Sequence, residues 1–399
     1  MSSLAYAIFT RIGLGGLAAI GLLALTATGF LAWRVVGARL PHRNREAQLA
    51  ALTILFFGFL DWALLSALPH LGLSFGPVAP ALLAFSMGRA AVFLVALLTL
   101  LALNLAQSRS TVSPAARRLS PALAALWALN LVLSACAVYG LYIEPFDLHT
   151  SHVNLPAPAF LPDRPLRIVH ISDIHVERIT RRERDLIETV RSLHPDLILL
   201  TGDYLNIDYT TDDLTRQDGR AVLAQFSAPY GVYAVAGTRG VDTPQAMRVI
   251  FDGVEATLLQ DETRLLEFPG GMIYLVGVST LNRPRDSAML AQQMVDVPRD
   301  AYSVLLYHTP DLADAAAQAG VDLYLGGHTH GGQVRLPFWG ALVTMSAYGK
   351  KYESGLYTLG PMHMYISRGV GMEGLRLPRL RFLCPPEVTL IELGPEGSP

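Results

Sequence analysis

Apolar residues are distributed unevenly along this chain. The first 146 residues contain four nearly uninterrupted apolar runs, over about residues 12–36, 49–68, 77–105 and 122–143. Each run is about 20 residues or longer, which is enough for a helix to cross a hydrocarbon layer about 30 Å thick. The pattern therefore predicts an all-α unit of four transmembrane helices over residues 1–146. A signal peptide is the alternative for the first run, although no small-residue cleavage site ends it cleanly.

Beyond residue 165 the pattern changes to short apolar stretches that each end in polar residues. Strands are expected over residues 166–172, 196–200, 231–236, 273–278, 303–307, 322–325, 355–358, 363–367 and 388–392. Helices are expected over residues 181–193, 219–225, 243–251, 285–294 and 312–319. Alternating strands and helices predict a layered α/β domain over residues 166–399. The Pro- and His-rich segment 147–165 has no period and is expected to be a linker.

Charge separates the same two parts of the chain. Overall, 51% of the residues are hydrophobic and 16% are charged, and the net charge is −2. The first 150 residues hold nine Arg, no Lys and four acidic residues, so they carry +5 and the remainder carries −7. This composition excludes a disordered chain. Neither part has a dense basic patch, which argues against nucleic acid as a partner.

The Arg residues between the apolar runs predict the membrane topology. Four of them lie between the first two runs (Arg34, Arg39, Arg43 and Arg45) and three lie between the last two (Arg109, Arg117 and Arg118). Loops rich in positive charge stay on the cytoplasmic side. The polar domain is then expected on the extracytoplasmic side of a multi-pass cell-membrane protein, with a bacterial inner membrane as the natural setting.

Two charged residues, Asp61 and Arg89, fall inside predicted transmembrane helices. A charge within the membrane is a candidate functional group. Counting residues from the helix ends places both at a similar depth in neighbouring helices. We favour a structural ion pair between them over a functional role.

In the polar domain, five strands end in residues that bind metals or form tight turns. These are Asp173-Ile-His175, Gly202-Asp203, Gly237-Thr238, His308 and Gly327-His328-Thr329-His330. Because strand ends in layered sheets meet at one edge, we expect these residues to assemble in space. Carboxylate and imidazole together suit Mn, Fe or Zn. Two such ions about 3.5–4 Å apart can hold a phosphoryl group and activate a water molecule between them.

In order and spacing, these motifs resemble those of the calcineurin-like metallophosphoesterases, above all the bacterial membrane-anchored members. The resemblance covers about residues 166–393. It implies two packed β-sheets flanked by helices, in α-β-β-α layers, and a binuclear metal site that hydrolyses phosphomono- or phosphodiesters. It also implies that the first metal is held by Asp173, His175 and His330, that Asp203 bridges the two metals, and that His308 and His328 hold the second.

The third motif departs from the family pattern. Family members carry Gly-Asn-His followed by an acidic residue, whereas this chain has Gly237-Thr238-Arg239-Gly240. Thr238 offers a hydroxyl where the family offers an amide oxygen, which makes it a poorer metal ligand. Arg239 keeps its proton at neutral pH, so it cannot replace the histidine as an acid, but it can stabilise developing negative charge.

Three interpretations follow from this departure. The chain is an active metallophosphoesterase in which Arg239 supplies electrostatic stabilisation, a metal- or phosphate-binding module with weak or no turnover, or a structural membrane component. We favour the first, because the other expected ligands are all present. The membrane helices favour a phospholipid or lipid-linked phosphate as substrate. The apolar segment Leu336-Pro337-Phe338-Trp339 is either a lipid-facing loop or part of the core or a lid, and Lys350-Lys351 either bind a phosphate group or form a solvated turn.

Overall fold

The computed structural model describes residues 44–107, 121–156, 164–269, 271–279, 283–374 and 379–394. The chain divides into two compact units. One comprises Met1–Tyr139 with Arg376–Arg379, and the other comprises Gly140–Leu375 with Leu380–Pro399. The first predicted transmembrane helix, over residues 12–36, lies outside the described residues.

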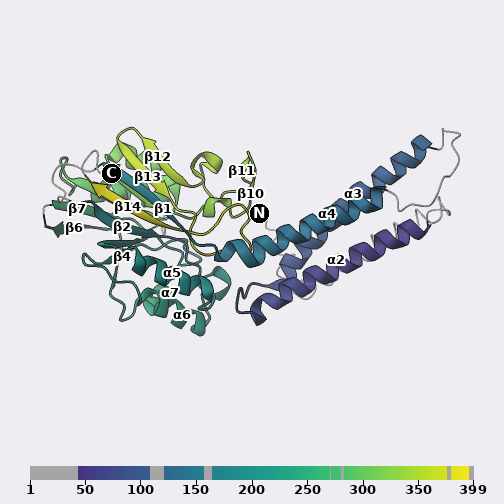
Figure 1. The fold of residues 1–399 in the computed structure, drawn as a ribbon. Helices are drawn as coiled ribbons and strands as arrows, with labels where there is room; N and C mark the ends of the chain where they lie inside the picture. The colour runs from purple at the N-terminus through teal and green to yellow at the C-terminus, as the bar shows by residue number, and fades with distance from the viewer. Residues whose placement is uncertain are drawn as a thin grey trace. The chain divides into compact units, whose positions relative to one another are not determined.

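The described part of the first unit consists of long apolar helices (Figure 1). These are α2 (Asn44–His70), α3 (Val78–Gln107) and α4 (Pro121–Val138), and α4 continues into a π-helical turn over Tyr139–Ile143. Within the described residues, three stretches are long and apolar enough to cross a membrane: Gln48–His70, Val78–Val95 and Leu123–Phe146. Their apolar residues surround the helix rather than forming one stripe, as is typical of helices that contact lipid.

Asp61 and Arg89 form the ion pair that their positions predicted. The Arg89 guanidinium donates two hydrogen bonds of 2.6 Å to the two Asp61 carboxylate oxygens, and both side chains are buried. The same guanidinium donates to the side-chain and main-chain oxygens of Asn130 and to the Ser134 hydroxyl on α4. One buried cation therefore joins α2, α3 and α4.

The second unit contains two six-stranded sheets in its described part. The first has the order β1 (His149–Pro156), β14 (Glu387–Gly394), β2 (Leu166–Ile171), β3 (Leu197–Leu200), β4 (Val232–Ala234) and β5 (Ala256–Leu258). The second has the order β12 (Gly355–Leu359), β13 (Met362–Ile366), β9 (Leu323–Gly326), β8 (Tyr302–Leu306), β7 (Gly271–Gly277) and β6 (Glu262–Phe268). A short hairpin joins β10 (Arg335–Leu336) to β11 (Gly340–Ala341).

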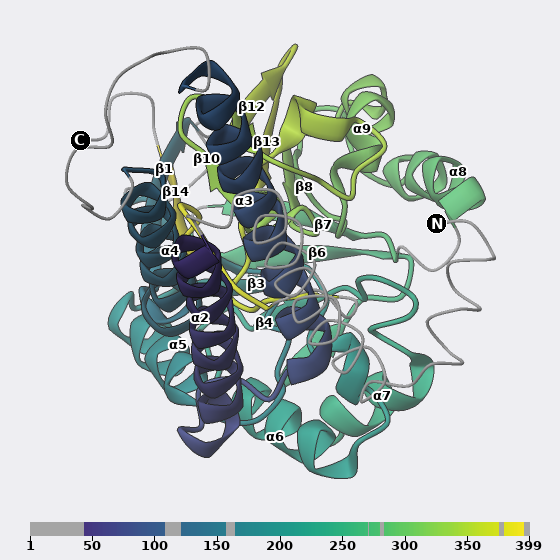
Figure 2. The same cartoon turned by 90° about the vertical axis from the view of Figure 1, so that its right-hand side faces the viewer.

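Helices accompany both sheets (Figure 2). Beside β3 and β4 lie α5 (Arg181–Ser192), α6 (Asp213–Leu223) and α7 (Pro244–Ile250). In the second sheet, α8 (Arg283–Met294) contacts β6 and β7, and α9 (Ala313–Ala319) contacts β12. One buried cluster takes side chains from both sheets, for example Ile168 of β2 and Val304 of β8. Separate clusters join the first sheet to α5–α7 and the second sheet to α8 and α9.

The segment 147–165 corrects one expectation from the sequence. Instead of an irregular linker, His149–Pro156 forms strand β1, which pairs in parallel with β14 over eight residues. Only Val153 and Leu155 point into the core, and the other side chains of β1 are polar or exposed. Because β1 is an edge strand with just two buried apolar side chains, its hydrophobic pattern is too weak to read from the sequence.

Candidate metal centre

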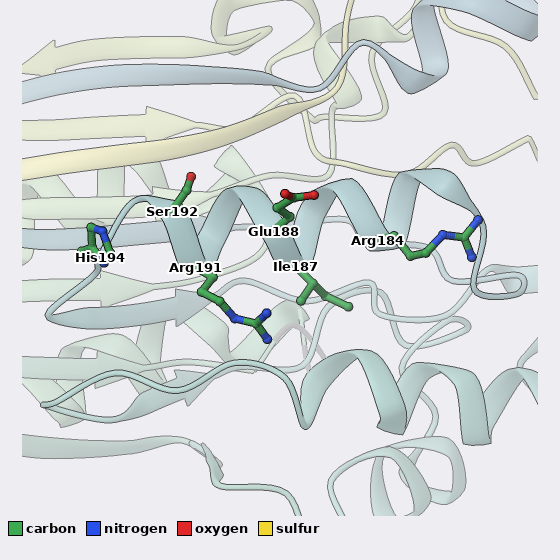
Figure 3. A pocket seen from close by; sticks show the side chains of 6 residues that line it. All are labelled: Arg184, Ile187, Glu188, Arg191, Ser192 and His194. Atoms are coloured by element: carbon green, nitrogen blue, oxygen red, sulfur yellow. The ribbon is translucent and has the colours of Figure 1, made fainter.

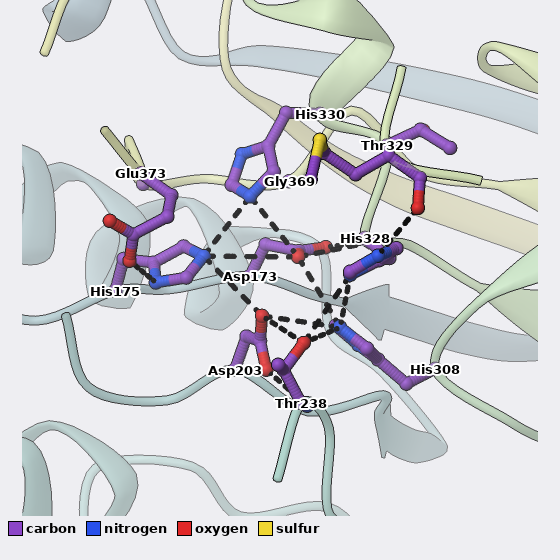
Figure 4. Close-up of polar contacts among 12 residues, drawn as sticks. Asp173, His175, Asp203, Thr238, His308, His328, Thr329, His330, Gly369 and Glu373 are labelled. Carbon is purple, nitrogen blue, oxygen red and sulfur yellow. Dashed lines mark hydrogen bonds and ion pairs between the residues drawn. The ribbon is translucent and has the colours of Figure 1, made fainter. Parts of the chain in front are cut away.

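The predicted ligands meet at the carboxyl ends of strands from both sheets (Figure 4). Asp173 and His175 follow β2, Asp203 follows β3, His308 follows β8, and His328 and His330 follow β9. Among the described residues, two groups of metal-binding side chains have their donor atoms within 4.8 Å of one another: Asp173, His175 and His330, and Asp203, His308 and His328. They are the same two groups that the resemblance implied.

The protonation of the second group shows why it needs a cation. His308 Nδ1 donates to the Thr201 carbonyl oxygen at 2.7 Å, and His328 Nε2 donates to the Met345 carbonyl oxygen at 3.1 Å. In neutral imidazoles the remaining nitrogens are then lone-pair acceptors. These two nitrogens, His308 Nε2 and His328 Nδ1, face each other at 3.1 Å. A proton or a metal ion between such groups removes their repulsion.

The first group also brings two imidazole nitrogens together. His175 Nε2 and His330 Nε2 are 3.0 Å apart, and His330 Nε2 is 3.3 Å from the Asp173 carboxylate. His175 directs its Nδ1 to the Leu205 carbonyl oxygen at 3.3 Å, which leaves Nε2 free to act as a ligand. His175 and Asp173 are fully buried. A buried set of one carboxylate and two imidazoles fits a divalent ion such as Mn, Fe or Zn.

Asp203 lies between the two groups. Its Oδ2 is 3.2 Å from His308 Nε2 and 3.8 Å from His175 Nε2. Burial alone would raise the pKa of Asp203, but the surrounding imidazoles, above all His308, hold that pKa well below its usual range. Burial also works against a charged His308, yet the Asp203 carboxylate outweighs it and raises the pKa of His308 to about 9. The Asp203 carboxylate therefore stabilises positive charge on the imidazoles around it.

The backbone at the ligands adopts an uncommon conformation. Asp173, His175, Asp203, His328 and His330 all have φ between 46° and 69°. Such left-handed backbone is unusual outside glycine, although Asp, Asn and His tolerate it best. Strained backbone of this kind concentrates at functional sites. Here it occurs at five of the six candidate ligands.

Comparison with known proteins agrees with this geometry. A family model described as calcineurin-like phosphoesterase matches residues 166–332. The protein named uncharacterized metallophosphoesterase YkuE of Bacillus subtilis is 31% identical over 273 residues, which cover 64% of this chain and 88% of that protein. Phosphodiesterase YaeI of Escherichia coli is 30% identical over 241 residues, which cover 59% of this chain and 85% of that protein. The chain belongs to the calcineurin-like phosphoesterase family. It is a hydrolase of phosphoric esters.

The altered third motif of this phosphoesterase lies beside the second group. The Thr238 hydroxyl is 3.1 Å from Asp203 Oδ2, 3.3 Å from His308 Nε2 and 3.4 Å from His328 Nδ1. The Thr238 backbone N–H donates to Asp203 Oδ1 at 2.6 Å. Arg239 follows with an exposed side chain. The hydroxyl thus lies among the ligand atoms even though it is a weaker donor than an amide oxygen.

Asp242 is a residue of the phosphoesterase site that the sequence did not reveal. Its buried carboxylate accepts hydrogen bonds from the backbone N–H groups of Asp203, Tyr204 and Gly237, at 2.7–3.1 Å. Burial and the nearby Asp203 carboxylate raise the pKa of Asp242 to about 7. This one side chain holds the loop after β3 against the loop after β4. It therefore fixes the position of Asp203.

The loop after β13 approaches the first group closely. Arg381 is buried and donates hydrogen bonds to the carbonyl oxygens of Arg368, Gly369, Gly371 and Cys384. A Cβ atom on Gly369 would lie 2.5 Å from the Asp173 Cβ, so glycine is required there. In this way Arg381 holds together the loop whose Gly369 lies against Asp173 in the phosphoesterase site.

Glu373 is a second residue that sequence reasoning missed. Its Oε2 lies 3.4 Å from His175 Nδ1 and accepts a hydrogen bond from the Ile207 N–H at 3.1 Å. A carboxylate behind a ligating imidazole fixes the orientation of the ring and makes it a stronger donor. We expect Glu373→Gln to weaken binding of the first metal by about 10- to 100-fold.

Isothermal titration of Mn²⁺ into the metal-stripped Glu373→Gln phosphoesterase measures this effect. The matched control is Glu188→Gln on the surface of α5. That residue lines a shallow hollow with Arg184, Ile187, Arg191, Ser192 and His194, none of which is a predicted ligand (Figure 3). Equal affinities for Glu373→Gln and the wild type would contradict a role of Glu373 in orienting His175.

Proposed function

We propose that this chain is a membrane-bound phosphoesterase that hydrolyses phosphomono- or phosphodiester bonds at a binuclear metal site. The observation that carries the proposal is the pair of ligand groups that converge on Asp203 with their imidazole lone pairs facing one another. Two bound divalent ions would polarise the phosphoryl group and lower the pKa of a water molecule between them. Mn, Fe and Zn all fit the donor set.

Each side chain has a distinct task in this proposal. Asp173, His175 and His330 would hold the first metal, and His308 and His328 would hold the second. Asp203 would contact both metals and keeps a negative charge at the centre. Thr238 would supply a weak additional donor to the second metal. The exposed Arg239 guanidinium stabilises negative charge that develops on the phosphoryl oxygens, because its planar group donates two parallel hydrogen bonds.

The arrangement of the chain forms part of the same proposal. We assign residues 1–146 to the transmembrane unit, 147–165 to the connection that includes β1, and 166–399 to the catalytic domain. The shared cluster between the sheets and the two outer clusters support the α-β-β-α layering. The Arg-rich loops between the apolar runs support an extracytoplasmic catalytic domain.

The apolar helices also support a substrate at the membrane. Three stretches of the described residues are suited to crossing a bilayer. A phosphoesterase held there meets phospholipids and lipid-linked phosphates at high local concentration. We therefore propose a lipid-borne phosphoester as the substrate class and exclude nucleic acid on the charge pattern.

Replacing the third motif tests whether the site turns over substrate. We expect the wild-type chain to hydrolyse a bis-aryl phosphodiester, and the double variant Thr238→Asn, Arg239→His to bind the second metal about tenfold more tightly, since an amide oxygen replaces a hydroxyl. Metal content and turnover are measured on both proteins.

An alternative function rests on the same altered motif. If the wild type binds metal but is inert under Mn, Fe and Zn while the double variant turns over, the native chain is a metal- or phosphate-binding module. Hydrolysis by the wild type excludes this alternative.

A further inference from the structure

An exposed apolar segment lies next to the metal groups. The hairpin β10–β11 and the residues after it, together residues 335–345, are here called the apolar hairpin. Its exposed side chains are Leu336, Phe338, Trp339, Leu342, Val343 and Met345. A contiguous apolar patch of this kind on a protein surface marks an interaction site more often than chance exposure.

The backbone at the tip of the apolar hairpin adopts a left-handed conformation that is unfavourable for a bulky residue. Phe338 has φ of 65° and is fully exposed. A turn in this conformation favours Gly or Asn, because a Cβ atom crowds the following carbonyl. A bulky aromatic residue at this position gains no packing against the part of the chain that the structure describes. Its apolar ring is therefore available for contact with a partner.

Cationic side chains lie at and near the apolar hairpin. Lys350 Nζ lies 4.6 Å from the centre of the Trp339 ring and donates to the Trp339 carbonyl oxygen at 2.5 Å. Arg335 and Lys350 share one acidic neighbour, Glu353, at 3.0 and 3.5 Å. Lys351 adds a further exposed cation. The patch thus has an excess of positive charge at its rim and apolar rings at its tip.

The apolar hairpin is connected directly to the ligand loops. Met345 accepts a hydrogen bond from His328 Nε2 at 3.1 Å, and Arg335 donates to the Gly331 carbonyl oxygen at 2.8 Å. A Cβ atom on Gly332 would lie 2.4 Å from the Ala341 Cβ, so the base of the hairpin presses against the loop that carries His330. Whatever binds the tip is held beside the metal groups.

We infer that the apolar hairpin inserts into the headgroup and upper acyl region of a lipid bilayer that contains anionic lipid. Aromatic rings with neighbouring Lys and Arg are the composition that favours this interface. The rim cations complement anionic headgroups. A bilayer is the occupant we choose because the same chain carries helices suited to crossing one. The inference rests on the proposed membrane-bound function and adds how the site meets its lipid-borne substrate.

Fluorescence of Trp339 tests the insertion without any need for turnover. The full chain is reconstituted in vesicles of phosphatidylcholine and phosphatidylglycerol, with and without bromine on the upper acyl chain. The chain has four Trp residues, so the signal of Trp339 is the wild-type emission minus that of Trp339→Phe. We expect bromolipid to quench this difference signal roughly twofold or more, as for an interfacial aromatic ring. Quenching by aqueous iodide alone would overturn the inference.

A charged substitution at the tip tests whether insertion affects hydrolysis. Phe338→Asp is expected to abolish the bromolipid quenching and to lower hydrolysis of a vesicle-borne phosphoester, relative to a soluble phosphodiester, by roughly tenfold. The matched control is Val295→Asp, since Val295 is also strongly exposed but follows α8. An unchanged ratio for Phe338→Asp would overturn the inference.

Two further outcomes separate the possibilities. Protection of Trp339 from iodide without bromolipid quenching, together with a dimer in detergent, would assign the hairpin to a second copy of the chain and overturn bilayer insertion. Bromolipid quenching in a protein that hydrolyses neither substrate supports insertion while the proposed catalytic function fails.

Discussion

Asp203→Asn is expected to lower the rate of phosphodiester hydrolysis by about a thousandfold. The Asp203 carboxylate lies within 3.2 Å of His308 and 3.8 Å of His175, so it contacts both metal groups. The change to Asn removes its negative charge and one strong oxygen donor. A metal centre contributes several kcal/mol to catalysis, and each ~1.4 kcal/mol corresponds to tenfold in rate. Loss of about 4 kcal/mol gives the expected factor.

The measurement combines bound metal per chain with turnover of a bis-aryl phosphodiester in added Mn²⁺ or Zn²⁺. We expect Asp203→Asn to retain less than the wild-type metal content. Asp252→Asn is the matched control, because Asp252 is exposed and pairs with Arg220 at 3.6 Å, remote in sequence from every ligand. Wild-type turnover by Asp203→Asn would show that Asp203 is not the bridging ligand.

The second large effect concerns the stability of the helical unit. Asp61→Asn and Arg89→Gln should each lower the free energy of unfolding by about 3 kcal/mol, because each leaves an unpaired charge in a buried setting. The double variant leaves no charge. We expect it to be more stable than the sum of the single effects by about 2 kcal/mol.

Unfolding by sodium dodecyl sulfate in mixed detergent micelles measures this coupling, with Trp62 on α2 and Trp127 on α4 as reporters. Thr53→Val is the control, because the Thr53 hydroxyl bonds within its own helix, to the Leu49 carbonyl oxygen at 2.8 Å. Its effect should stay near 1 kcal/mol. Strictly additive single effects would contradict an energetic pairing of Asp61 with Arg89.

The sequence predicted those parts of the fold whose side chains are apolar on a regular period. Strands such as β3, with its run Leu197–Leu200, and helices such as α5 are recognisable because burial selects their side chains directly. Strand β1 escaped prediction because its stability comes from pairing with β14, which lies more than 200 residues away in the chain. Pairing across such a separation leaves no local pattern.

For the candidate site, the motifs whose His and Asp side chains the fold brings together were readable because such residues recur beside Gly at several strand ends. The residues that orient them were not. Asp242 acts on backbone N–H groups of a distant loop, and Glu373 reaches His175 from the loop after β13. A carboxylate in a loop is ordinarily a turn or cap residue, so neither had a signature before the fold brought it to its partner.

The position of β14 has a consequence for how the chain is made. This last strand of the described residues lies between β1 and β2, in the interior of the first sheet. More than 200 residues separate the end of β2 from β14, which corresponds to roughly 10–40 s of translation at about 5–20 residues per second. During that interval the edges of β1 and β2 that pair with β14 remain unpaired. We therefore expect nascent chains to depend on holding chaperones, and truncation before β14 to direct the chain to proteolysis.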